Sequence, residues 1–248
     1  MAPGKYLLLL SLLLLVAALA TFQGAQSVIF RSSASLTESL QTHSHSSLDL
    51  MFFLVAYTSL AFSVLLVIAC YTDIHPVSGL VVLTLLSTCV WLNCLLKLAM
   101  HEPRPYWVYA DVRAIACDGG WGSPSGHAMT TGTLWGWVIG QMLRTRWRVW
   151  VSLLLLALLM VGFDRVYLGV HFYSQVALGW CFAFFLVVVT NLIYRRLQSG
   201  LSKMRFKWIL LSNVFAVCLY SLVVLTYISI NPAWEEVWSV NIHSVPPS

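Results

Sequence analysis

The sequence predicts an all-α integral membrane protein built as a six-helix bundle. Its 248 residues are 59% hydrophobic and only 9% charged, and the mean hydropathy is +0.82. A soluble domain is about half apolar and about one quarter charged, so the shortage of charge indicates a membrane protein. Several apolar stretches also exceed about 18 residues, the length that a spanning helix needs. The net charge of +5 is small, and its distribution gives no indication of a nucleic-acid partner.

Residues 1–25 have the pattern of a secretory signal peptide. Lys5 precedes an apolar run, and the Ala-Leu-Ala sequence at 18–20 resembles a cleavage site. The apolar run is shorter than a comfortable membrane span. The alternative is an extra N-terminal helix that is not cleaved. Residues 26–48 are polar and rich in serine, and we expect a loosely ordered lead-in there.

Six apolar runs follow, and each is about as long as the hydrocarbon core of a bilayer is thick. Since backbone in lipid must satisfy its own hydrogen bonds, we expect each run to be a helix and the six to form one domain over residues 49–230. Residues 231–248 form a C-terminal tail. The predicted spans lie near residues 49–71, 77–99, 125–143, 148–165, 173–194 and 207–229.

Basic residues predict the orientation of the bundle. The links after the third and fifth spans hold eight of the fourteen Lys and Arg residues, and the positive-inside rule places both links in the cytosol. The segments 97–124 and 166–172 then emerge on the lumenal or extracellular side, in the endoplasmic reticulum or the plasma membrane. The basic residues of the two links are Arg144, Arg146, Arg148, Arg195, Arg196, Lys203, Arg205 and Lys207.

Polar residues gather at three helix junctions on that far side. Lys97 and Arg104 close the second span, "GSPSGH" at 122–127 opens the third, and Arg165 and His171 lie between the fourth and fifth. Each motif alone has a structural explanation, as a snorkelling anchor, a helix cap or an interfacial histidine. Charged groups near lipid are costly and usually functional, so three such motifs at one depth indicate a shared pocket.

The residue types in these motifs predict a phosphate site. Lys and Arg bind tetrahedral oxyanions, and a helix N-terminus offers amides and a partial positive charge to a phosphate. Pro124 suits the first turn of such a helix, and Gly126 lets the backbone approach a ligand closely. We therefore expect His127 to be directed at the bound anion.

Together the three motifs resemble the type 2 phosphatidic acid phosphatase superfamily, which shares its helical core with vanadium haloperoxidases. The similarity covers roughly residues 49–230. In finer detail the chain is similar to the glucose-6-phosphatase branch. The stretches "WLNCLLKLAMHEPRPYWV", "CDGGWGSPSGHAM" and "RVYLGVHFYSQV" carry that detail.

The resemblance implies hydrolysis through a covalent intermediate. His171 would attack phosphorus and form a phosphohistidine, and His127 would protonate the leaving oxygen and then activate water. The reaction that the resemblance implies requires no metal and no other cofactor. The groups that would hold the phosphate oxygens are Lys97, Arg104, Ser125, Arg165 and the amide of Gly126.

One position departs from the wider superfamily, which has an aspartate four residues after the nucleophilic histidine. This chain has Gln175, as the glucose-6-phosphatase branch does, so we do not interpret the change as inactivating. A glutamine carbonyl can fix the tautomer of the imidazole but brings no negative charge. Asp164 replaces a serine that is common before the arginine of this motif, and it either pairs with Arg165 or supplies the missing charge.

We expect the partners to be the lipid bilayer and a phosphorylated lipid or sugar substrate. A lipid phosphate suits a site at the bilayer surface and the compact size of the bundle, and it is the first expectation. A sugar phosphate, above all glucose 6-phosphate, suits the motif detail, although glucose-6-phosphatases have nine spans. The alternative of another class is a catalytically silent membrane protein that binds lipid or a partner protein. The intact His127, Arg165 and His171 argue against it.

Overall fold

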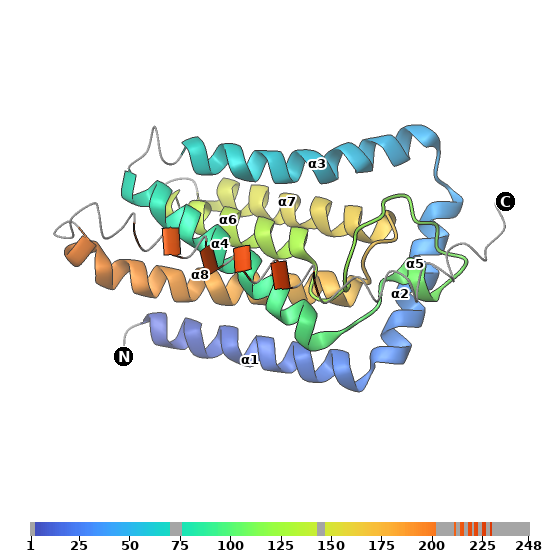
Figure 1. The fold of residues 1–248 in the computed structure, drawn as a ribbon, viewed down its shortest axis with the longest axis horizontal. Coiled ribbons are helices and arrows are strands. Elements are labelled where there is room, and N and C mark those ends of the chain that lie inside the picture. Colours follow the sequence, from blue (N-terminus) through green and yellow to red (C-terminus); the bar gives the residue numbers. More distant parts are fainter. Residues whose placement is uncertain are drawn as a thin grey trace.

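The computed structural model is a bundle whose long helices run roughly along one axis (Figure 1). It describes residues 3–69, 76–142 and 147–201, with scattered positions between 211 and 229. Every regular element in these ranges is a helix. In chain order they are α1 (Pro3–Gly24), α2 (Gln26–Thr42), α3 (Ser46–Ala69), α4 (Pro76–Met100), α5 (Pro105–Val108), α6 (Gly126–Met142), α7 (Trp147–Tyr167) and α8 (Tyr173–Leu201).

The all-helical membrane fold predicted from the apolar runs is confirmed, and the count of six spans is approximate. Five predicted spans correspond to α3, α4, α6, α7 and α8, whereas only scattered positions of the span predicted at 207–229 belong to the described residues. Within the described part, the candidate membrane spans by length and apolar composition are Lys5–Gly24, Val81–Val108, Arg148–Tyr167 and Tyr173–Tyr194. The second of these runs past the end of α4 and includes α5. Helix α6 has only 17 residues.

The N-terminal apolar run forms helix α1, which packs against α8 (Figure 1). Leu15 is buried in the main core, and Leu19 and Phe22 pack against that core. These contacts give α1 a place in the folded bundle. Its cleavage as a signal peptide stays a prediction.

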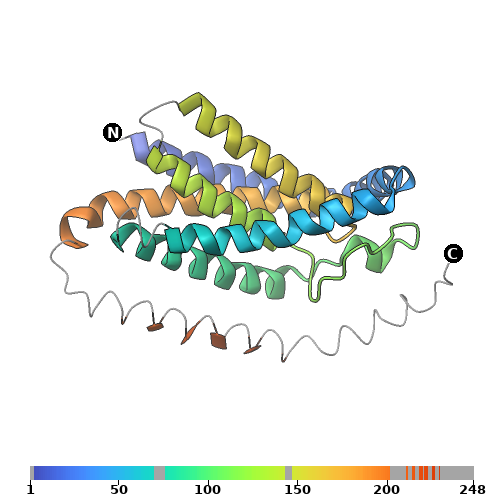
Figure 2. The same cartoon turned by 90° about the horizontal axis from the view of Figure 1, so that it is seen from above.

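The loose order expected for residues 26–48 is wrong, because Gln26–Thr42 forms helix α2 across one end of the bundle (Figures 1 and 2). Serine content predicted disorder, but the buried residues of α2 recur on one helical face. The ring of Phe30 stacks on Phe172 with centroids 4.0 Å apart, and Ser33 Oγ accepts a hydrogen bond from Tyr173 N. The buried residues are Phe30, Ser33, Ala34, Thr37 and Gln41.

The main core lies among α1, α4, α6 and α8. Leu134 and Trp137 of α6 and Leu178 of α8 are almost fully buried there. Two glycines let α6 and α8 approach closely: a Cβ added to Gly132 would lie 2.8 Å from Cβ of Ala183, and one added to Gly179 would lie 2.9 Å from Ser125 O. The contact therefore fixes the start of α6 against α8.

The three polar motifs meet at one end of the bundle, because α4 and α7 end where α6 and α8 begin. Helices α2 and α5 lie at the same end (Figures 1 and 2). His101 ends α4 in the left-handed region, with φ of 51°, a common way to turn the chain out of a helix. Gly169, with φ of 76°, makes the sharp turn between α7 and α8.

Candidate active site

His171 lies in the turn between α7 and α8, and Gln175 in the first turn of α8 orients its ring. The His171 Nδ1 is 3.2 Å from Gln175 Oε1, which also accepts a hydrogen bond from Phe172 N at 3.3 Å. An amide oxygen only accepts, so Nδ1 of His171 carries the ring proton. The lone pair on Nε2 is therefore the nucleophilic one.

Arg104 joins the loop before α6 to the turn that carries His171. Its Nε donates to Gly120 O at 2.7 Å, and its Nη1 donates to Val170 O at 2.9 Å. The same Nη1 lies 3.5 Å from His171 Nε2, on the side opposite Gln175. A cation is thus held where charge on an anion bound to Nε2 would develop.

Arg165, at the end of α7, is oriented by its neighbour Asp164. Asp164 Oδ2 accepts from Nε and Nη2 of Arg165 at 2.9 Å and 2.7 Å, so the pairing alternative raised for Asp164 is the one observed. The remaining Nη1 lies 3.3 Å from Nδ1 of His127. A guanidinium only donates, so Nδ1 of His127 accepts and neutral His127 carries its proton on Nε2.

The other predicted phosphate ligands lie at the same end. Lys97, in the last turn of α4, donates through Nζ to Trp121 O, which is also 3.5 Å from Arg104 Nη2. Ser125 N donates to Gln175 O at 3.0 Å, which fastens the start of α6 to the first turn of α8. Gly126 is the first residue of α6, so its amide precedes the helical hydrogen-bond ladder.

Burial and positive neighbours keep His171 neutral. The residue is only 2% exposed. Burial first, and then the cations Arg104, Lys97 and Arg165, lower the pKa of His171 well below its usual value, while the hydrogen bond with Gln175 opposes this. A neutral imidazole is the nucleophilic form, so the electrostatics favour attack on an electrophile across the neutral pH range.

Asp118 is a residue of this cluster that the sequence did not predict. Its Oδ2 lies 3.6 Å from Arg104 Nη1 and 3.7 Å from Arg165 Nη1, and its side chain is 34% exposed. The carboxylate thus occupies the space between two guanidinium groups that would bind an anion. Asp118 belongs to the "CDGG" stretch noted in the sequence, but it is far from Arg165 along the chain, so the contact between them could not be predicted.

Glu102 was also missed, although a charged residue at the end of an apolar span was a usable signal. It is buried, and its Oε2 accepts a hydrogen bond from Gln175 Nε2 at 3.2 Å.

No group of three or more His, Cys, Asp or Glu side chains in the described ranges forms a metal-binding arrangement.

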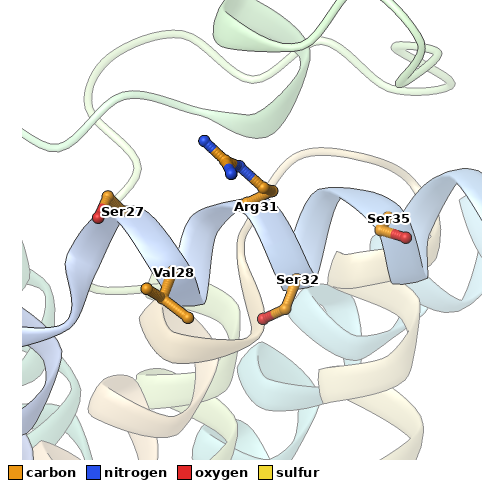
Figure 3. Close-up of a pocket in the computed structure, with 5 residues that line it drawn as sticks. All are labelled: Ser27, Val28, Arg31, Ser32 and Ser35. Carbon is orange, nitrogen blue, oxygen red and sulfur yellow. The ribbon is translucent and has the colours of Figure 1, made fainter.

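A surface cavity of about 310 Å³ lies on α2, apart from these residues (Figure 3). All of its lining residues belong to α2, and none of them is a member of the cluster. They are Ser27, Val28, Arg31, Ser32 and Ser35.

Replacing Asp118 with asparagine should strengthen anion binding at the cluster. The carboxylate competes with a bound anion for Arg104 and Arg165, and a partly exposed ion pair of this kind is worth up to about 1 kcal/mol, or roughly fivefold in affinity. We expect Asp118→Asn to tighten the dissociation constant for inorganic phosphate about threefold to fivefold, measured by ligand-dependent thermal stabilisation. Asp111→Asn, an exposed change in the same loop, is the control. Unchanged or weaker binding would mean that the carboxylate does not occupy the position of the anion.

Comparisons with known proteins agree with this arrangement. The family model described as the PAP2 superfamily matches residues 76–199, which are half of the chain. Human glucose-6-phosphatase 3 is 34% identical over 122 residues, covering 41% of this chain and 35% of that protein. Glucose-6-phosphatase catalytic subunit 1 of Haplochromis nubilus is 30% identical over 115 residues, covering 36% and 33%. The chain spans about a third of the length of these curated relatives.

Two solved structures have a similar fold. The transmembrane PAP2 type phosphatidylglycerolphosphate phosphatase of Bacillus subtilis superposes with a TM-score of 0.62 at 20% identity, covering 83% of this chain and all of that one. LpxE of Aquifex aeolicus gives a TM-score of 0.52 at 22% identity, covering 63% and 93%. The matched half of the chain contains all three motifs, and the resemblance inferred from them is confirmed: the chain belongs to the PAP2 superfamily.

Proposed function

We propose that this chain is a membrane phosphohydrolase that cleaves phosphate monoesters through a phosphohistidine on His171. The observation that carries the proposal is the pairing of each histidine with a different kind of partner. Gln175 Oε1 accepts from Nδ1 of His171, whereas Arg165 Nη1 donates to Nδ1 of His127. The two neutral rings therefore differ at Nε2, which has a lone pair in His171 and a proton in His127.

In the first step, Nε2 of His171 forms a bond to phosphorus while the phosphorus–oxygen bond of the ester breaks. His127, as the imidazolium that takes up a solvent proton when the ester dianion binds, gives its Nε2 proton to the leaving oxygen and becomes neutral, so an alcohol departs rather than an alkoxide. Arg104 and Arg165 stabilise the negative charge on the transferring phosphoryl group. Lys97, the hydroxyl of Ser125 and the amide of Gly126 at the start of α6 complete the anion site.

In the second step, His127 takes a proton from a water molecule whose oxygen attacks phosphorus. The nitrogen–phosphorus bond breaks, inorganic phosphate forms, and His171 regains its lone pair. Both histidines then have their original protonation states, so the cycle closes without another reactant.

Substitution of the histidines tests the mechanism. We expect His171→Ala to abolish hydrolysis because no nucleophile remains, and His127→Ala to lower kcat by about 10²- to 10⁴-fold because the acid is lost. Steady-state phosphate release checks both, with His45→Ala on the exposed surface as the control. Elution profile and melting temperature report whether each variant folds. Near-normal turnover by a folded His171→Ala protein would remove the nucleophile assignment.

A lipid phosphate is the first candidate substrate. The cluster lies at the end of helices that are long and apolar enough to span a bilayer. On α7, Leu159 and Phe163 expose apolar surface just before Asp164 and Arg165. An acyl chain could lie against that surface while its phosphate enters the cluster.

A sugar phosphate is the second candidate, and one specific observation favours it. Human glucose-6-phosphatase 3 is 34% identical over the aligned 122 residues. That similarity supports a shared phosphate site and makes glucose 6-phosphate the sugar phosphate to test on this chain.

A substrate panel in detergent separates the two candidates. We expect kcat/KM to be higher for phosphatidate or a sphingoid phosphate than for glucose 6-phosphate, because α7 offers apolar surface next to the cluster. His171→Ala, assayed on every substrate, sets the background from contaminating phosphatases. A clear preference for glucose 6-phosphate would replace the lipid proposal with the sugar one.

We further infer that the site faces the lumen or the exterior, since the basic links after the third and fifth predicted spans favour the cytosol. Cys117, exposed in the loop before α6, reports this orientation. In sealed microsomes from a variant with Cys117 as its sole cysteine, a membrane-impermeant maleimide should react only after detergent is added. A matched variant with Lys203→Cys as its sole cysteine should react before detergent. The reverse pattern would overturn the orientation.

A further inference from the structure

A second buried carboxylate lies behind the residue that orients His171. Glu102 follows α4, two residues before Arg104, and it is only 7% exposed. Its Oε2 accepts a hydrogen bond from Nε2 of Gln175 at 3.2 Å. Burial of a carboxylate is costly unless hydrogen bonds or opposite charges compensate it, and the Gln175 amide provides one such hydrogen bond to Glu102.

The amide of Gln175 is held in one orientation by acceptors on one side and donors on the other. Its Nε2 donates to Glu102 Oε2 and to Pro103 O, at 3.2 Å and 2.9 Å. Its Oε1 accepts from Phe172 N and faces the Nδ1 of His171. A rotated amide would set its oxygen against two acceptors, so the observed orientation is strongly favoured.

The backbone packs tightly onto this amide. Gly122 N donates to Glu102 O at 2.8 Å, and a Cβ added to Gly122 would lie 2.5 Å from Nε2 and 2.6 Å from Oε1 of Gln175. Ser125 N donates to Gln175 O at 3.0 Å. The amide therefore has no room to turn away, and one amide group links Glu102 to His171.

We propose that Glu102 is a positioning residue that supplies negative charge to His171 through the Gln175 amide. The inference rests on the proposed function, because it assigns a role within the same reaction. Asp164 is not connected in this way, since its Oδ2 is bound by Nε and Nη2 of Arg165. A chain of hydrogen bonds polarises its members, so the carboxylate makes Oε1 a stronger acceptor.

This charge matters most when the imidazole becomes positive. As Nε2 of His171 bonds to phosphorus and the ester oxygen leaves with the proton of His127, the His171 ring takes on positive charge. The proton on Nδ1 stays on the ring, and its hydrogen bond to Gln175 strengthens. When water breaks the nitrogen–phosphorus bond, the ring becomes neutral again. Glu102 therefore stabilises the intermediate and its flanking transition states more than the ground state.

An exchange of the two side chains tests the proposal. Glu102→Gln removes the charge and should lower kcat on the order of tenfold, the size typical of a partner that orients a functional histidine, while KM changes less than about twofold. Gln175→Glu places two carboxylates in contact and should lower kcat at least as much. The double variant Glu102→Gln, Gln175→Glu restores one charge and one donor between the two positions. It should be at least about fivefold more active than Gln175→Glu, with recovery incomplete because Pro103 O loses its donor.

The control is Glu38→Gln, the same substitution at an exposed position of α2, which should leave kcat and KM unchanged. A folded Glu102→Gln variant with kcat within about twofold of wild type would overturn the inference. Losses that simply multiply in the double variant would also overturn it, because they would mean that the two residues act independently. If Glu102→Gln does not fold, the comparison of the folded double variant with Gln175→Glu decides.

Anion binding separates failure of this inference from failure of the proposed function. Orthovanadate can bond to the histidine nitrogen, whereas inorganic phosphate binds without such a bond. We expect Glu102→Gln to weaken orthovanadate at least about fivefold and phosphate less than about twofold, measured by thermal stabilisation. A wild-type protein without turnover on any substrate would overturn the proposed function. The ratio of the two anion affinities would still decide the role of Glu102: an unchanged ratio overturns it, and a lowered ratio supports it.

Discussion

Buried positive charge at one end of an apolar bundle is the constraint from which the rest of this site follows. Arg104 and Arg165 are 2% and 1% exposed, so each guanidinium must find acceptors inside the protein. Arg104 takes the carbonyls of Gly120 and Val170, which belong to two different loops. Satisfying one side chain therefore joins the loop before α6 to the turn after α7, and His171 follows Val170 directly.

Three carboxylates around these cations differ in exposure and in partner, and so in what they can do. Asp164 is buried and fixes the fork of Arg165, while Glu102 is buried and holds the amide of Gln175. Asp118 is about one third exposed and bonds more loosely to Arg104 and Arg165. The first two are parts of the framework. The third is a counter-charge that we expect a stronger anion to displace, because it is the most exposed of the three carboxylates.

Helix α2 contributes to the same end of the bundle without supplying a charged group to the cluster. Gln41 donates to Tyr167 O at 2.8 Å and accepts from Arg113 N at 2.9 Å, and Phe30 covers Phe172. These contacts restrain the turn that carries His171 from the side opposite the core. A turn held from both sides keeps His171 in place, as the nucleophile role that we propose for it requires.

The helical class and the three motifs could be predicted from the chain alone, because apolar length and short-range spacing are local properties. It also placed Lys97, Ser125 and His171 at one end, since alternating spans bring those junctions together. The partner of each carboxylate became known only from the folded arrangement of the helices and loops. Glu102 and Gln175 are 73 positions apart, and spacing carries no information about a contact between residues so distant along the chain. The packing of α2 could not be predicted for the same reason. Its polar composition indicated disorder, and its buried face forms only by contact with residues distant in the sequence, such as Phe172.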